Sequence, residues 1–232
     1  MSRPPALPPP APPETSPAEL LAYYDGCLAR HGDSAQGAGW PNAADRRLRF
    51  AVMRDLAWRG GPLGSLCDVG CGTGAFLDHL QDSGAAPARY LGLDLSAAAI
   101  GYAQRRHAAA IAAGRAGFAV VDLLRAPAPG RFDHVVANGL FTVRAGLCED
   151  RMWAFTTACL AAMWAMTGRA MAFNVMSAVV DWRREDLFHV EADRLLAFLY
   201  RLAGGRRVIL RADYDLYEYT AYVYRDPVAG RG

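Results

Sequence analysis

Three alternating glycines make up the segment of the sequence best suited to hold a ligand. Gly70, Gly72 and Gly74 stand in the run DVGCGTG, between a short apolar segment and a segment with helical spacing. Glycine lets the chain turn sharply and lets its backbone come close to a bound molecule. In an open α/β sheet such a turn lies at the carboxyl edge, where ligands bind. Because the spacing is GxGxG and not GxGxxG, a pyrophosphate cradle for a dinucleotide is a poor fit.

Two aspartates follow at the ends of the next two predicted strands. Asp94, in the run GLDLS, can accept hydrogen bonds from both hydroxyls of a ribose. The alternative is a helix-capping aspartate, although Ser96 is already placed to cap that helix. Asp122, in the run VVDLL, is placed to meet an adenine amino group, with an ordinary turn aspartate as the alternative. We expect the leucines that follow the two acids, Leu95 and Leu123, to lie against the ring faces.

The segments around these residues alternate between strand and helix patterns. Short apolar runs predict five strands, over residues 65–70, 88–95, 117–123, 131–139 and 169–175. Helical spacing predicts helices after four of them, over residues 74–82, 96–110, 149–166 and 191–203. Two further strands, over 206–213 and 216–225, are separated only by a turn. This order predicts an α/β fold: a Rossmann-like, seven-stranded, mostly parallel sheet with an antiparallel C-terminal edge strand and helices on both faces.

A helix and a glycine-rich loop precede the first strand. Ser16 and Pro17 are typical of a helix start, and we expect this helix to run to about His31. The loop over residues 31–42 leads into a second helix, expected over residues 45–59. The first helix and the loop are therefore candidates to contribute residues to the site.

The domain organisation is simple. Residues 1–16 are rich in proline and have little to bury, so we expect a disordered or locally polyproline tail there. Residues 17–226 are expected to form one domain, followed by a short tail over residues 227–232. No internal repeat or second domain is visible, and a monomer and a homodimer both remain open.

The composition limits the classes of partner and chemistry. The formal charge of +2 is too small to indicate a nucleic-acid partner. No apolar run approaches the ~20 residues that span a bilayer, and no signal peptide is visible, so we expect a cytoplasmic protein with no membrane partner. The sequence contains no lysine, which excludes Schiff-base and lysine general-base chemistry. The five cysteines are odd in number and have no CxxC spacing, so we expect neither a disulfide framework nor a metal site.

The runs DVGCGTG, GLDLS, VVDLL and FDHVVANG resemble the successive S-adenosylmethionine (SAM) binding motifs of class I SAM-dependent methyltransferases. They occur in the order and at the spacing of that family, and together they span residues 65–140. The resemblance implies the methyltransferase fold and SAM as the cofactor. It places the cofactor contacts at Asp68, Gly70, Gly72, Gly74, Asp94, Leu95, Asp122, Leu123 and Asn138.

A narrower resemblance covers almost the whole predicted domain. A group of small bacterial methyltransferases shares a Gly-Trp before an Arg-Phe helix, an FN…D segment after the fifth strand, and a final YxxYEFT hairpin. The corresponding residues here are Gly39, Trp40, Arg49, Phe50, Phe173, Asn174, Asp181, Tyr214, Tyr217, Glu218, Tyr219 and Thr220. Two positions depart from the pattern, because Val179 stands where an aromatic residue is expected and Tyr219 replaces phenylalanine. Both positions are expected near the substrate. The identity of the substrate is therefore the least transferable of the inferences that this resemblance supports.

The residues expected to act in catalysis lie near the ends of the fourth and fifth strands or on the N-terminal helix. Methyl transfer displaces a leaving group that is already activated, so positioning and desolvation do most of the work. Trp40 and Tyr23 are expected to pack on the cationic sulfonium or to form only a hydrophobic lid. Arg49 is expected to pair with the SAM carboxylate or to stay solvated. His134, inside a predicted strand, is interpreted as structural. The catalytic candidates are Asn138, Tyr23, Asn174 and Ser177.

Three functions fit these features. The leading hypothesis is methylation of a small molecule, in secondary metabolism or glycan assembly. The absence of a DPPY-like tetrapeptide after the fourth strand argues against adenine-N6 or glutamine methylation. The second hypothesis is a SAM cyclase that forms azetidine-2-carboxylate and methylthioadenosine from SAM alone. The third is a SAM-binding protein without catalytic activity.

Overall fold

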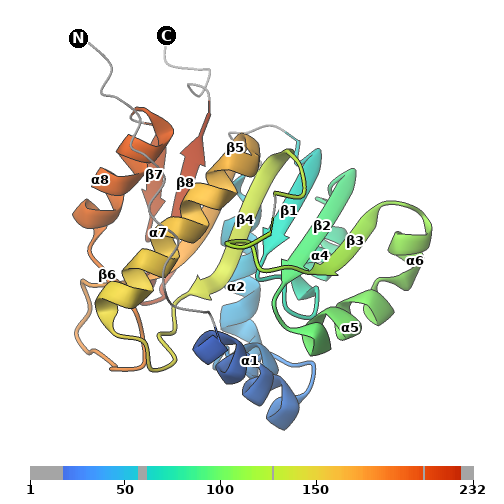
Figure 1. Cartoon of the computed structure of the whole chain (residues 1–232), viewed down its shortest axis with the longest axis horizontal. Coiled ribbons are helices and arrows are strands. Elements are labelled where there is room, and N and C mark those ends of the chain that lie inside the picture. The colour runs from blue at the N-terminus through green and yellow to red at the C-terminus, as the bar shows by residue number, and fades with distance from the viewer. Residues whose placement is uncertain (1–17, 57–61, 127, 206, 226–232) are drawn as a thin grey trace.

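The chain folds around one mixed β-sheet, shown in Figure 1. The computed structural model describes residues 18–56, 62–126, 128–205 and 207–225. The strand order is β3-β2-β1-β4-β5-β8-β7, and the short strand β6 pairs with β5 off this path. The strands are β1 Ser65–Val69, β2 Arg89–Asp94, β3 Ala116–Val120, β4 Phe132–Phe141, β5 Thr167–Ser177, β6 His189–Val190, β7 Val208–Arg211 and β8 Glu218–Tyr224.

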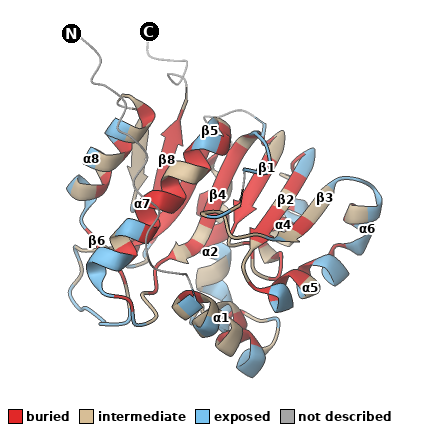
Figure 2. Cartoon of the chain, viewed as in Figure 1, coloured by how far each residue is buried: buried red, intermediate tan, exposed pale blue. Residues whose placement is uncertain are grey.

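Helices cover both faces of this sheet (Figures 1 and 2). One apolar core packs α7 and α8 against the sheet, and a second packs α2, α4 and α5 against the opposite face. In the central strand β1, Leu66 belongs to one core, while Cys67 and Val69 belong to the other, as expected for a parallel strand buried on both faces. The helices are α1 Ala18–His31, the 3₁₀ turn η1 Gln36–Ala38, α2 Ala43–Arg54, α4 Ala75–Asp82, α5 Ala97–Arg106, α6 Ala108–Ala112, α7 Glu149–Met166 and α8 Ala192–Ala203.

The predicted fold class is confirmed, and the structure refines the position of the antiparallel strand. Strand β8 is antiparallel to both of its neighbours and lies between β5 and β7, so that β7 is the edge strand. Burial agrees with this order, because every residue of β8 is buried, whereas every residue of β7 is only half-buried. The sequence pattern did not indicate the two-residue strand β6.

Strand β4 is interrupted near its carboxyl end. Ala137 pairs with Phe173 of β5, but Phe141 pairs with Val175, so β4 carries two more residues than β5 between these pairs. The extra length forms a bulge over residues 138–140. Bulges next to binding sites redirect side chains that a regular strand would hold in its ladder.

Two polar side chains have the structural roles that the sequence predicted. The Ser96 hydroxyl accepts a hydrogen bond from the Ala99 N–H at 3.0 Å and caps α5. His134 is fully buried, with Nδ1 2.9 Å from the Leu63 carbonyl oxygen, consistent with a structural role.

The five cysteines are free thiols. None of the described helices is long and apolar enough to cross a bilayer. The predicted tails over 1–16 and 227–232, the helix start at Ser16 and Pro17 and the last turn of the second helix lie outside the described residues.

Candidate functional site

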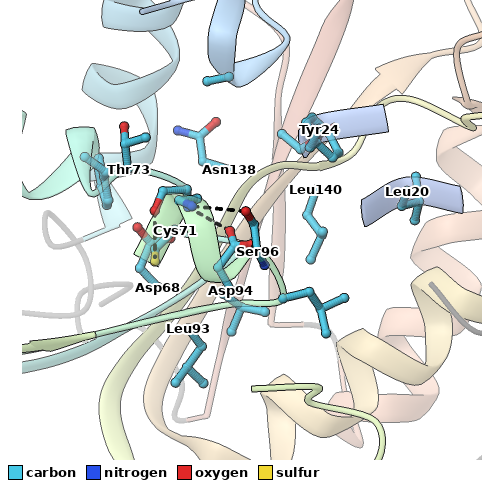
Figure 3. Close-up of a pocket in the computed structure, with 18 of the residues that line it drawn as sticks. Leu20, Tyr24, Asp68, Cys71, Thr73, Leu93, Asp94, Ser96, Asn138 and Leu140 are labelled. Atoms are coloured by element: carbon cyan, nitrogen blue, oxygen red, sulfur yellow. Dashed lines mark hydrogen bonds between the residues drawn. The ribbon is translucent and has the colours of Figure 1, made fainter. Parts of the chain in front are cut away.

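A pocket lies at the carboxyl ends of β1, β2 and β4, beneath α1 and the loop that follows it (Figure 3). It encloses about 1320 Å³ of atom-free space, which includes its opening to solvent. Most of its lining is apolar, as in other small-molecule sites. The predicted cofactor residues that line it are Trp40, Asp68, Gly70, Gly72, Asp94, Leu95, Asp122, Leu123 and Asn138.

The glycine turn connects β1 to α4. All three glycines have positive φ, with values of 74° at Gly70, 53° at Gly72 and 79° at Gly74. A Cβ at Gly72 would meet no atom within 4 Å, so the backbone there faces the open pocket. Gly74 differs from the prediction because it does not line the pocket. A Cβ at Gly74 would lie 2.9 Å from the His107 ring, so this glycine allows α4 to pack against the end of α5.

Asp94 joins the end of β2 to the glycine turn. Its two carboxylate oxygens accept hydrogen bonds from the backbone N–H groups of Gly72, at 2.8 Å, and Ser96, at 2.9 Å. Burial raises the pKa of the Asp94 carboxyl, and these backbone hydrogen bonds oppose the shift. Each oxygen of a carboxylate has a second lone pair, so Asp94 can still accept hydrogen bonds from a ligand.

Asp68 lies at the floor of the pocket, at the end of β1. The Tyr90 hydroxyl donates a hydrogen bond of 2.5 Å to its carboxylate. Burial raises the pKa of Asp68 to about 7, although the hydrogen bond from Tyr90 acts in the opposite direction. The charge of Asp68 therefore changes near neutral pH.

Asp122 follows β3, where the sequence placed it. Its carboxylate accepts a hydrogen bond from the Leu124 N–H at 3.1 Å and lies 3.5 Å from Arg125 Nε. The neighbouring Val121 N–H donates to the Asp94 carbonyl oxygen at 2.9 Å, which joins the ends of β2 and β3. Leu123 lies beside Asp122 in the lining, so an acceptor and an apolar surface are available for a purine ring.

Asn138 is the predicted catalytic residue that the structure places in the pocket. It stands at the start of the β4 bulge (Figure 3). Its side-chain oxygen and nitrogen are closed to solvent, and neither has a hydrogen-bond partner in the described part of the chain. An unpaired buried amide is unfavourable by about 1–3 kcal/mol per group. A ligand that supplies a donor and an acceptor would remove this penalty.

The N-terminal helix contributes Tyr24 to the lining, and not the predicted Tyr23. The Tyr24 hydroxyl donates to the Gly139 carbonyl oxygen at 3.1 Å. Tyr23 packs edge-on against the Tyr24 ring, with centroids 5.1 Å apart, outside the pocket lining. Successive residues of a helix point about 100° apart, which is why neighbouring tyrosines have different environments.

The arginine at the pocket is Arg46, and not the predicted Arg49. Arg49 is buried, with Nε 2.8 Å from Glu218 Oε1, and its guanidinium lies 4.3 Å from the centre of the Trp40 ring. Arg46, one helical turn earlier on α2, lines the pocket, and its Nε has no hydrogen-bond partner among the described residues. Arg46 is therefore the better placed cation for a ligand carboxylate.

Two other predicted catalytic residues lie outside the pocket lining. Asn174 is buried in β5, where its Oδ1 accepts a hydrogen bond from the Gly139 N–H at 2.7 Å. Ser177 ends β5, and its hydroxyl accepts a hydrogen bond from the Val179 N–H at 3.0 Å. The sequence did not indicate several lining residues whose orientation depends on how the helices pack: Leu20, Leu21, Arg46, Phe155 and Cys159. It did not indicate Leu140 either, which lies in the β4 bulge.

Comparisons with known proteins agree with this architecture. The family described as "Methyltransferase domain" matches residues 66–160. A Mycobacterium tuberculosis protein named "Putative methyltransferase Rv1506c" is 32% identical over 166 residues, which cover 68% of this chain and 92% of that protein. The N-methyltransferase NodS from Bradyrhizobium japonicum, solved with S-adenosyl-l-homocysteine, superposes with a TM-score of 0.61 at 18% identity. That match covers 89% of this chain and 98% of NodS.

A second solved structure shares the fold within a much longer chain. The small RNA methyltransferase HEN1 superposes with a TM-score of 0.57 at 15% identity over 81% of this chain. This chain spans 26% of the HEN1 chain. At such low identities the structural similarity establishes the fold and leaves the acceptor open.

The conformation and surroundings of Gly139 disfavour any side chain at this position. Its φ of 86° is unfavourable for an L-residue, and a Cβ there would lie 2.3 Å from the Trp40 ring. We therefore expect Gly139→Ala to lower the free energy of unfolding by roughly 2–5 kcal/mol. The matched control is Gly146→Ala, which has a similar φ of 88° but no atom within 4 Å of the added Cβ. Chemical denaturation of both variants checks this, and equal losses would mean that the Trp40 contact carries no weight.

Proposed function

Because the chain belongs to the class I SAM-dependent methyltransferases and uses SAM as its cofactor, we propose that it transfers a methyl group from SAM to a small molecule. The observation that carries the proposal is the Asn138 amide, unpaired among the described residues, in a mostly apolar pocket that also holds the cofactor residues. SAM supplies, when bound, an electrophilic methyl carbon on a positively charged sulfur.

The lining residues fit the chemical groups of SAM. We assign the ribose hydroxyls to Asp94, whose oxygens retain free lone pairs, and the adenine amino group to Asp122. Leu95 and Leu123 are assigned to the faces of the adenine ring. The open backbone at Gly72 leaves room for close approach, and Arg46 is assigned to the carboxylate. Trp40, which lines the pocket, is assigned to pack near the sulfonium or to act as a lid.

The lining titratable groups suggest an acceptor that needs little help from a base. The Tyr24 hydroxyl donates to the Gly139 carbonyl oxygen, and burial raises its pKa. Burial also raises the pKa of the Cys71 and Cys159 thiols, so thiolates are disfavoured there. Asp94 and Asp122 are assigned to the ribose and the adenine, and Asp68, a predicted cofactor contact, already accepts a hydrogen bond from Tyr90. We therefore propose an acceptor with a nucleophile that is already available at neutral pH, held by the Asn138 amide and desolvated by apolar side chains.

The comparisons do not favour the two other functions considered. The relatives are described as methyltransferases, and neither cyclisation of SAM nor a non-catalytic role finds support among them. A nucleic-acid acceptor is also not proposed, because the net charge is only +2 and the pocket is lined mainly by apolar side chains. A place in secondary metabolism or glycan assembly stays a prediction.

The ribose assignment predicts the effect of removing one carboxylate. Asp94→Ala should weaken SAM binding by about 1.5–3 kcal/mol, the scale of lost charge-assisted hydrogen bonds. The matched control is Asp133→Ala, because Asp133 also accepts hydrogen bonds, from Ser65 N–H and Oγ–H at 2.8 Å each, but lies outside the pocket lining. Titration calorimetry measures both. Unchanged affinity for SAM in a folded Asp94→Ala protein would contradict the assignment of the ribose hydroxyls to Asp94.

The raised pKa of Asp68 predicts a pH dependence of SAM binding. A carboxyl with a pKa of about 7 is mostly protonated at pH 6 and gains its negative charge as the pH rises. A cationic ligand binds the charged form better, so SAM affinity should increase between pH 6 and 7.5, by up to about tenfold. Asp68→Asn should flatten this increase. Comparing the two proteins at each pH cancels the titration of SAM itself, and parallel curves would contradict the prediction.

Product analysis tests the proposed function directly. With SAM alone we expect no turnover, and with a fractionated pool of small metabolites we expect S-adenosylhomocysteine together with one product heavier by a methyl group. Asn138→Ala should lower that turnover at least about tenfold, or about 1.4 kcal/mol, with little change in SAM affinity. Methylthioadenosine from SAM alone would replace the proposal with cyclisation. Turnover that requires added RNA would mean that the acceptor is a nucleic acid and not a small molecule.

A further inference from the structure

A buried ion pair lies behind the pocket, where the proposed chemistry does not use it. Glu218, at the start of β8, is only 2% exposed, and its Oε1 lies 2.8 Å from Arg49 Nε. Burial raises the pKa of the Glu218 carboxyl, while Arg49 and Asn174 oppose the shift. Replacing such pairs with apolar residues is often neutral or stabilising, so stability alone is a weak reason for a buried ion pair.

One branch of contacts leads from Glu218 to the β4 bulge. Glu218 Oε2 accepts a hydrogen bond of 3.1 Å from Asn174 Nδ2. Asn174 Oδ1 in turn accepts one of 2.7 Å from the Gly139 N–H. A carboxylate accepts hydrogen bonds, so Glu218 orients the Asn174 amide with its nitrogen toward Glu218 and its oxygen toward the Gly139 N–H. Glu218 thus determines the acceptor that holds the bulge.

The second branch reaches the same residue from the opposite side. The Arg49 guanidinium lies over the Trp40 ring at 4.3 Å, and the Trp40 ring packs against the α-carbon of Gly139. Gly139 is also held through its carbonyl oxygen, which accepts hydrogen bonds from Tyr24 at 3.1 Å and Thr142 at 2.9 Å. Both branches from Glu218 therefore converge on the residue that follows Asn138.

We propose that Glu218, Arg49 and Asn174 form a positioning unit that fixes the β4 bulge and so directs the Asn138 amide into the pocket. This inference rests on the proposed function of Asn138. The three residues come from α2, β5 and β8, and the structure brings them together behind one strand end. None of the three residues lines the pocket, whereas Trp40, Asn138 and Gly139 do, so their role is to orient these residues and not to react.

Nuclear magnetic resonance of ¹⁵N-labelled protein tests this arrangement without any assay of turnover. In Asn174→Ala, which removes the acceptor of the Gly139 N–H, hydrogen exchange at Gly139 should accelerate at least about tenfold. Exchange at Val135 and Val136, in the regular part of β4, should stay unchanged. The Asn138 side-chain amide signals, assigned by their loss in Asn138→Ala, should shift.

Glu218→Gln provides an isosteric second variant that preserves the size of the buried side chain. It removes the charge facing Arg49, and the Asn138 signals should shift in it as well. The matched control is Tyr222→Phe, which removes another buried hydrogen bond from β8 to α2, of 2.6 Å to the Val52 carbonyl oxygen, and does not contact Gly139. The control should leave the Asn138 signals and the exchange at Gly139 unchanged.

Binding and turnover complete the test. In the Asn138→Ala background, Glu218→Gln should have little further effect on turnover, because residues that act through one another are not additive. Unchanged Gly139 exchange and Asn138 signals in folded variants would overturn the inference, as would equal acceleration at all β4 amides, which indicates a global loss of stability. If the wild-type protein fails to bind SAM, the proposed function fails, while the exchange and side-chain signals still decide whether the unit positions Asn138.

Discussion

The conformation of Gly139 is the constraint on which the site depends. Its φ of 86° and its contact with the Trp40 ring leave no room for a side chain. Both of its backbone polar groups are hydrogen-bonded by side chains, so the bulge is held from both sides of the strand. A regular strand would keep Ala137 to Phe141 in the β5 ladder. Because the bulge removes residues from that ladder, Asn138 and Leu140 become available to the pocket.

Helix α1 and the loop that follows it make hydrogen bonds next to the residues proposed to bind the ligand. Asp25 accepts a hydrogen bond of 2.5 Å from Ser96, which follows Asp94 by two positions. Asp33 accepts one of 2.7 Å from Thr73, which is adjacent to Gly72. Tyr24 makes the third contact, at Gly139, beside Asn138. Each of these contacts is made by a neighbour of a proposed ligand residue, so α1 and its loop are fixed beside the residues proposed to hold SAM.

The sequence predicted those parts of the site that depend on local spacing. The glycine turn, Asp94 and Asp122 follow strand ends, and the carboxyl ends of parallel strands meet at one edge of a sheet, so their proximity followed from the order of elements. Which of two neighbouring side chains enters the pocket depends on how its helix is rotated against the sheet. This applies to Arg46 and Arg49 and to Tyr23 and Tyr24. The sequence does not specify that rotation, because both faces of these N-terminal helices are partly polar. Asn174 was expected in the pocket because it ends a strand. The bulge in β4 instead places the Gly139 N–H against it, and no periodicity in the sequence indicates that bulge.

The charges of the pocket also bear on the release of the product. Three aspartates and one arginine line it, and burial raises the pKa of Asp68 and Asp94, which shows that the pocket disfavours their negative charge. A positively charged ligand relieves this unfavourable burial. Under the proposed function, SAM carries a positive sulfur and S-adenosylhomocysteine a neutral one, so the same carboxylates stabilise the substrate complex more than the product complex. The electrostatics that help to bind SAM therefore also help to release the product, and no separate charged group among the lining residues is needed for that step.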